Sequence, residues 1–215
     1  MTQRKRVVVS LAALSAVSLV MWLVGVVAVH GWQFTYLLWN LFLAWTPLLV
    51  TALLVKLLRS RAWSSWLPFC VSVLWILLLP NSFYMISDFI HLGSVAPAHI
   101  LFDVVLFTVI ITTGVLLGFA SLSMINDELD KRLPRDIVGP AIGVVILVCS
   151  FAIYLGRDLR WNSWDVLLNP AGILFDVSDH LLHPFQHGAM FTTTLSFFVL
   201  LGSLYAIGRI WYNRD

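Results

Sequence analysis

The amino-acid sequence predicts an all-α polytopic membrane protein, in which six transmembrane helices form one integral membrane domain over residues 1–215. Hydrophobic residues make up 60% of the chain and charged residues 11%, whereas soluble domains have roughly 45–50% and 25%. A net charge of +2, with basic residues scattered in short loops, argues against nucleic acid as a partner. The two cysteines lie inside apolar runs, which excludes a disulfide framework and a cysteine-based zinc site.

Six apolar runs are long enough to cross about 30 Å of hydrocarbon at about 1.5 Å per residue. The first is too long for the roughly 7–15-residue apolar region of a cleaved signal peptide, so it is predicted to be an uncleaved helix. The second contains Asn40, which lipid would penalise unless its side chain faces the protein interior. The predicted spans are 7–29, 34–58, 63–81, 100–124, 137–155 and 189–210.

The third run is predicted to stop at Pro80 and Asn81 and to continue as an interfacial or re-entrant helix. On that helix Ser87 and His91 share a face at a spacing of four residues, and Asp88 lies three residues before His91. The alternative is that Asp88 and His91 only solvate and cap a short helix.

The loops predict the orientation, because cytoplasmic loops carry an excess of Lys and Arg. Six spans put both termini on one side, which is predicted to be the cytoplasmic side of a plasma membrane. That side has 11 of the 13 basic residues: Arg4, Lys5, Arg6, Lys56, Arg59, Arg61, Lys131, Arg132, Arg135, Arg209 and Arg214. The opposite side has Arg157 and Arg160 and all six histidines: His30, His91, His99, His180, His183 and His187. A polar site on the external face is one interpretation; the other is that long external loops simply collect polar residues.

The external segment 156–187 is longer than connections between helices usually are, and connections of this length often have a function. Trp161 and Trp164 are predicted to anchor it at the membrane interface, with ligand stacking as the alternative. Residues 176–182 are predicted to form a short amphipathic element on the membrane surface.

Three motifs resemble those of the bacterial membrane proteins catalogued as domain of unknown function 1361. They are NLFLAWTPLL (40–49), LLLPNSFYMISDFIHL (77–92) and GRDLRWNSWDVL (156–167). The resemblance covers most of the chain and implies a six-span protein, but it implies no reaction. The motif positions that it identifies are Asn81, Asp88, His91, Arg157, Arg160, Asn162 and Asp165.

Imidazoles and carboxylates on one side of the membrane are the ligands of a catalytic zinc site with an open position for water. The predicted metal ligands are His91, His183 and His187, and the predicted catalytic residues are Ser87, Asp88 and Asp103. The order of these residues is similar to that in the multispan hydrolase superfamily that contains the alkaline ceramidases. Its pattern is a Ser and His four apart, an Asp on the next helix and a His pair four apart on the last helix.

Two departures from that superfamily are visible: it has seven spans, and Pro184 follows His183 and disfavours helical geometry there. The expected activity is a metal-assisted hydrolase or transferase acting on a lipid or envelope substrate. The alternative is a non-catalytic accessory, transport or anion-binding protein that holds a headgroup, since Arg presents planar paired donors to phosphate or carboxylate. Its expected ligand-binding residues are Asn81, Arg157, Arg160, Asn162, Trp164 and Asp165. Salt bridges of the two arginines to nearby aspartates would explain the same residues without a ligand.

Overall fold

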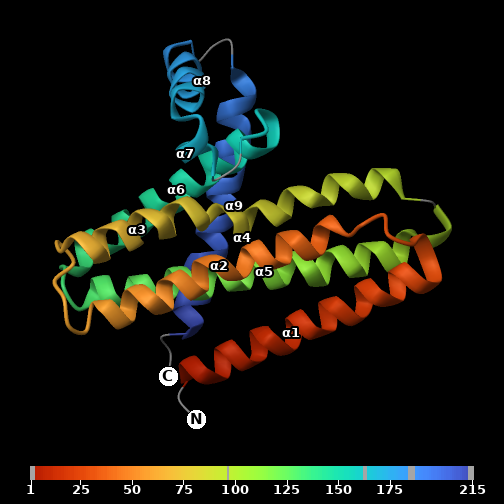
Figure 1. Ribbon diagram of the computed structural model, residues 1–215, viewed down its shortest axis with the longest axis horizontal. Helices are drawn as coiled ribbons and strands as arrows, with labels where there is room; N and C mark the ends of the chain where they lie inside the picture. Colours follow the sequence, from red (N-terminus) through yellow and green to blue (C-terminus); the bar gives the residue numbers. More distant parts are fainter. Residues whose placement is uncertain (1–2, 96, 162–163, 184–186, 213–215) are drawn as a thin grey trace. The chain divides into compact units, whose positions relative to one another are not determined.

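The computed structural model describes residues 3–95, 97–161, 164–183 and 187–212 and contains helices and no strands within these ranges (Figure 1). Six described helical segments are long and apolar enough to cross a membrane. They are Gln3–Val29, Tyr36–Leu57, Trp66–Gly93, Pro97–Asp130, Asp136–Asp158 and Gly188–Trp211. The predicted all-α, six-span architecture is therefore confirmed.

The chain divides into two compact units, Met1–Ile125 and Asn126–Asp215, which are described separately. A single domain stays a prediction. Unit 1 contains α1 (Gln3–Gly25), η1 (Val26–His30), α2 (Tyr36–Leu57), α3 (Trp66–Leu78), α4 (Pro80–Tyr84), η2 (Met85–Ser94), η3 (Pro97–His99) and most of α5 (Ile100–Asp130). Unit 2 contains the end of α5 with α6 (Arg135–Asp158), α7 (Asp165–Leu168), α8 (Pro170–Leu182) and α9 (Gly188–Tyr212).

Hydroxyl and indole groups join the long helices of unit 1 inside an otherwise apolar core. The hydroxyls of Ser18 on α1 and Thr113 on α5 lie 3.3 Å apart. Ser121 on α5 lies 2.7 Å from the Thr51 hydroxyl of α2 and accepts a 2.8 Å hydrogen bond from the Trp75 indole of α3. Because lipid offers polar groups no partner, such contacts between helices satisfy them internally.

Two glycines let α5 approach α4 and η2 closely. A Cβ atom at Gly114 would lie 2.4 Å from Sδ of Met85, and one at Gly118 would lie 2.6 Å from the Phe83 ring. Both Met85 and Phe83 are fully buried. Small residues at helix contacts therefore allow the backbones in unit 1 to pack tightly, as in many membrane helix pairs.

The predicted helix break at Pro80 and Asn81 is wrong. Leu79 keeps right-handed helical dihedrals (φ −55°, ψ −39°), and Pro80 occupies the first turn of α4, a position where the missing N–H has no helical partner to lose. The helical path continues to Gly93 as one candidate span, and its winding changes to 3₁₀ at Met85. The third span is therefore a continuous helical segment with a tighter outer part.

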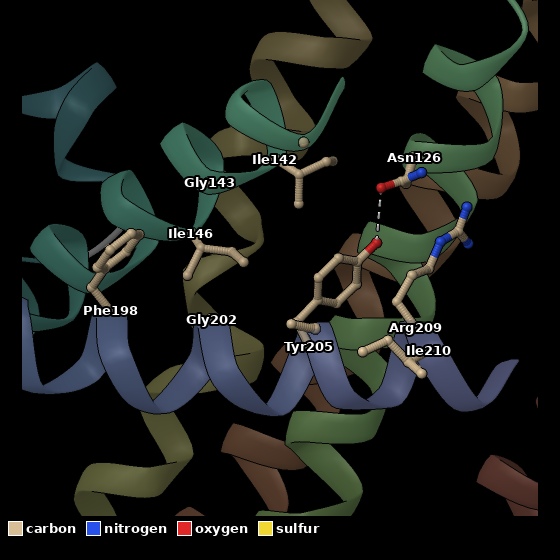
Figure 2. Close-up of a pocket in the computed structure, with 11 residues that line it drawn as sticks. Asn126, Ile142, Gly143, Ile146, Phe198, Gly202, Tyr205, Arg209 and Ile210 are labelled. Atoms are coloured by element: carbon tan, nitrogen blue, oxygen red, sulfur yellow. Dashed lines mark hydrogen bonds between the residues drawn. The ribbon is translucent and has the colours of Figure 1, made fainter. Parts of the chain in front are cut away.

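In unit 2, α6 and α9 border an open pocket of about 380 Å³, lined mainly by apolar side chains and glycines (Figure 2). Its polar end contains Asn126, Tyr205 and Arg209. The Tyr205 hydroxyl donates to Oδ1 of Asn126 at 3.3 Å, while Arg209 pairs with Asp127 at 2.8 Å and Asp130 at 3.0 Å. Ion pairs therefore surround the Arg209 guanidinium at this end of α9.

Candidate functional site

Asp88 and His91, two of the predicted site residues of unit 1, meet α2 in a row of two contacts. Nδ2 of Asn40 donates a 2.8 Å hydrogen bond to Oδ2 of Asp88, whose side chain is only 2% exposed. One step along the row, the rings of Tyr36 and His91 make an edge contact at 5.1 Å. The partner of Asp88 is thus an amide on α2, which sequence analysis had identified only as a side chain that should face inward.

The 3₁₀ winding of η2 accounts for the register of this row. Three residues of a 3₁₀-helix rise about 6 Å, as do four residues of an α-helix. Asp88 and His91 are three residues apart on η2, and their partners Asn40 and Tyr36 are four apart on α2. The two helices therefore stay level from one contact to the next, and Asp88 and His91 both face α2.

The same winding changes which predicted catalytic residues lie together. In a 3₁₀-helix residues three apart share a face, so Asp88 and His91 do, whereas Ser87 and His91 do not. The Ser87 hydroxyl donates at 2.7 Å to the Tyr84 carbonyl. Asp103 is 1% exposed on α5, and Asn81 is half-buried in α4.

A His/Asp cluster in unit 2 brings together the other predicted metal ligands. The Asp179 carboxylate contacts Nδ1 of His183 at 3.0 Å with one oxygen and Nε2 of His187 at 3.1 Å with the other. The rings of His180 and His187 stack with centroids 3.7 Å apart. Asp179, His180 and His187 each offer a ligand atom, and these atoms all lie within 4.8 Å of one another.

The hydrogen bond of His180 fits a metal ligand. Its Nδ1 lies 2.7 Å from the Asp176 carbonyl, which can only accept, so Nδ1 carries the hydrogen and Nε2 of the neutral ring carries the lone pair. Metal-bound histidines usually have their second nitrogen fixed in this way. Oδ2 of Asp179 lies 3.1 Å from Nε2 of His187. This distance is close to the roughly 3.4 Å between two ligand atoms that are each about 2.1 Å from a tetrahedral zinc ion.

The cluster also favours an ionised carboxylate at Asp179. Desolvation acts to raise the pKa of this carboxyl, but hydrogen bonds from His187 and His183 outweigh it and hold the pKa below its ordinary value. A carboxylate must be deprotonated to bind a metal ion. Asp179 is therefore in its ligand form across the neutral range.

Two aromatic residues at the end of α6 position α8. The Trp161 indole donates a 2.8 Å hydrogen bond to the Asp176 carboxylate, and the Tyr154 ring contacts the His180 ring at 5.8 Å. A Cβ atom at Gly172 would lie 2.8 Å from the Trp161 ring, so a glycine is needed for this approach. Asp176 thus links Trp161 to the His/Asp cluster, because its side chain accepts from Trp161 while its carbonyl orients His180.

The structure brings only some of the predicted metal ligands into one cluster. His187 belongs to the donor group, whereas His183 reaches it through Asp179. His183 and His187 do not share a helix, since α8 ends at Leu182 and α9 begins at Gly188. His183 leaves helical dihedrals (φ −118°, ψ 56°), as expected for a residue before proline. His91 belongs to unit 1, so a site that includes all three histidines stays a prediction.

His180 was not predicted as a ligand, although its place four residues after Asp176 and directly after Asp179 was visible in the sequence. The spacing of residues along a single helix gives no reason to choose His180 as a ligand. The ring contact with His187, which lies beyond the end of α8, is a feature of the tertiary structure.

Of the predicted anion-binding residues, Arg157 lies in the last turn of α6, Arg160 lies just after this helix, and Asn81 belongs to α4 of unit 1. Arg160 has a left-handed φ of 61°, and the N–H of Trp161 then bonds to the Leu155 carbonyl. The ion pairs of the described residues do not include Arg157 or Arg160. Trp164 is 45% exposed, Asp165 begins α7, and Asn162 lies outside the described residues. An anion site here stays a prediction.

These features define a multi-pass α-helical membrane protein with a buried polar row in unit 1 and a His/Asp cluster in unit 2. The chain belongs to the family described as Protein of unknown function (DUF1361), whose model matches residues 39–202. Neither curated proteins nor solved structures gave a significant match.

Proposed function

We propose that the protein is a zinc-dependent hydrolase or transferase of a bacterial plasma membrane that acts on a lipid or envelope substrate. The observation that carries the proposal is the group of Asp179, His180 and His187, whose ligand atoms lie within 4.8 Å of one another. Three protein ligands with a fourth position left for water are typical of catalytic zinc sites. The catalytic roles of Ser87, Asp88 and Asp103, which belong to unit 1, stay predictions.

The chemistry follows from the donor set. Zinc held by Asp179, His180 and His187 would supply a water molecule whose pKa is lowered to about 7, which would make it a nucleophile for an ester carbonyl carbon or a phosphoester phosphorus. His183 would accept the proton of that water: its Nδ1–H donates to Asp179, which leaves Nε2 as the base on a half-exposed ring. An aspartate that orients a histidine in this way is a recurrent arrangement for general bases.

The orientation proposed for this protein puts the N- and C-termini in the cytoplasm. It is supported by the excess of Lys and Arg on the side of the termini and of the loops 58–65 and 131–134. The His/Asp cluster would then lie on the external side, between the end of the fifth span at Asp158 and the start of the sixth at Gly188.

Metal analysis of the purified full-length protein tests the proposal. We expect about one zinc ion per chain after dialysis against trace zinc, and His180→Gln or His187→Gln should weaken zinc binding by about 100-fold or more. His99→Gln, which changes an exposed histidine of unit 1, is the matched control and should bind zinc as the wild type does. Absence of zinc from the wild-type protein, or equal binding by all variants, would overturn the metal site.

His91→Gln decides the predicted participation of His91 in the same experiment. Weakened zinc binding would add His91 to the ligand set. Unchanged zinc binding would confine the metal site to unit 2.

A further inference from the structure

The outward face of α8 is apolar. Gly172, Asp176 and His180 recur every four residues on α8 and contact Trp161 and Tyr154 of unit 2. On the other side of the helix, Leu174, Phe175 and Leu182 are 65%, 73% and 75% exposed. These three residues are called the outer apolar face, and large apolar groups exposed together mark a contact surface.

A bilayer would cover this face, because both ends of the α7–α8 segment adjoin candidate membrane spans. The segment follows a candidate span that ends at Asp158 and precedes another that begins at Gly188. The 13 residues of α8 extend about 20 Å, which is too short to cross about 30 Å of hydrocarbon. A helix that cannot span, carries an apolar face and starts and ends at the membrane boundary lies along the interface.

The His/Asp cluster borders the outer apolar face. Phe175 precedes Asp179 by four residues and Leu182 follows it by three, so both side chains flank this carboxylate on the helix surface. Asp179 itself contacts His183 and His187. A polar group bound at the cluster would therefore lie beside acyl chains that contact Phe175 and Leu182.

We propose that α8 is an interfacial helix whose outer apolar face inserts into the leaflet, and that the substrate is an acyl lipid of that leaflet whose headgroup linkage reaches the His/Asp cluster from the side. The proposal rests on the metal-dependent function proposed above and names its substrate class. It excludes a water-soluble substrate that enters from the aqueous phase.

Spin labels in the full-length protein, reconstituted in phosphatidylcholine–phosphatidylglycerol vesicles, test the position of α8. Labels at Leu174→Cys and Phe175→Cys, with Cys70→Ala and Cys149→Ala as background, should be more accessible to oxygen than to a water-soluble nickel chelate. Arg61→Cys, in an exposed loop, is the control and should show the opposite order. If the labels on α8 were, like the control, more accessible to the nickel chelate than to oxygen, the interfacial helix would be overturned whether or not zinc binds.

A second measurement tests the substrate class. Phe175→Ser/Leu182→Ser should reduce zinc-dependent turnover of a bacterial lipid extract in vesicles by at least 10-fold while zinc content is unchanged. Turnover of a water-soluble metabolite extract by both proteins, with no turnover of lipid, would overturn the lipid substrate and leave the metal site standing. Loss of zinc from the wild-type protein would instead overturn the proposed function.

Discussion

At the scale of single residues, the hydrogen bond from Asn40 to Asp88 is expected to stabilise unit 1. Asn40→Leu keeps a similar volume but removes the donor 2.8 Å from a nearly buried carboxylate. Loss of one donor to a buried charge should lower the free energy of unfolding by about 2 kcal/mol. Thermal unfolding in detergent measures the change, and Phe42→Leu, at a 59% exposed position on the same helix, is the control. Equal unfolding temperatures for the two variants would show that the contact contributes nothing.

The existence of a partner for Asp88 could be predicted from the sequence, but its identity could not. An aspartate at the edge of the hydrocarbon needs a donor, and Arg157 and Arg160 were the external cations available. Asn40, 48 residues earlier, donates a hydrogen bond to Asp88 from α2, the helix that this part of η2 faces. Nothing in a local hydropathy pattern distinguishes 3₁₀ from α winding over ten residues.

At the scale of helices, the close contact between α5 and α4 predicts a specific sensitivity to size. In Gly118→Ala the new Cβ would lie 2.6 and 2.8 Å from two carbons of the buried Phe83 ring and 2.9 Å from Cβ of Ser82. Such overpacking should cost about 1–3 kcal/mol in the free energy of unfolding. Gly139→Ala on α6, where a Cβ meets nothing within 4 Å, is the matched control and should be neutral or stabilising by up to about 1 kcal/mol. Chemical denaturation of the two variants measures both effects, and a lower stability of Gly139→Ala would contradict this explanation.

The helices themselves were predictable because their signal is local. Each span is a run of apolar residues long enough for the hydrocarbon, and all six runs became candidate spans. The error at Pro80 arose because the sequence does not show where in a helical turn a proline will lie. Proline removes one hydrogen-bond donor, but the first turn of α4 needs no donor at that position, so the helical path continues through Pro80. The amphipathic element predicted at 176–182 is the C-terminal half of α8.

At the scale of the whole chain, charge predicts the topology that hydropathy leaves undetermined. Of the 13 basic residues, only Arg157 and Arg160 fall outside the side of the termini. Positive charge is retained on the cytoplasmic side during insertion, so the segregation of the histidines follows from the same orientation. The proposed roles of the His/Asp cluster and of α8 on an external substrate depend on it.

Cysteine labelling in intact cells tests that orientation. In a background with Cys70→Ala and Cys149→Ala, Gly93→Cys and Gly188→Cys should react with a membrane-impermeant thiol reagent. Both positions are exposed, and a Cβ there meets nothing within 4 Å. Leu133→Cys, in the exposed connection between α5 and α6, should react only after the cells are permeabilised. Its neighbours Lys131 and Arg132 belong to the excess of positive charge on the side of the termini, which is the side proposed to be cytoplasmic. Reaction of Leu133→Cys alone in intact cells would invert the topology, place His180 and His187 in the cytoplasm and direct the search for a substrate to the inner leaflet.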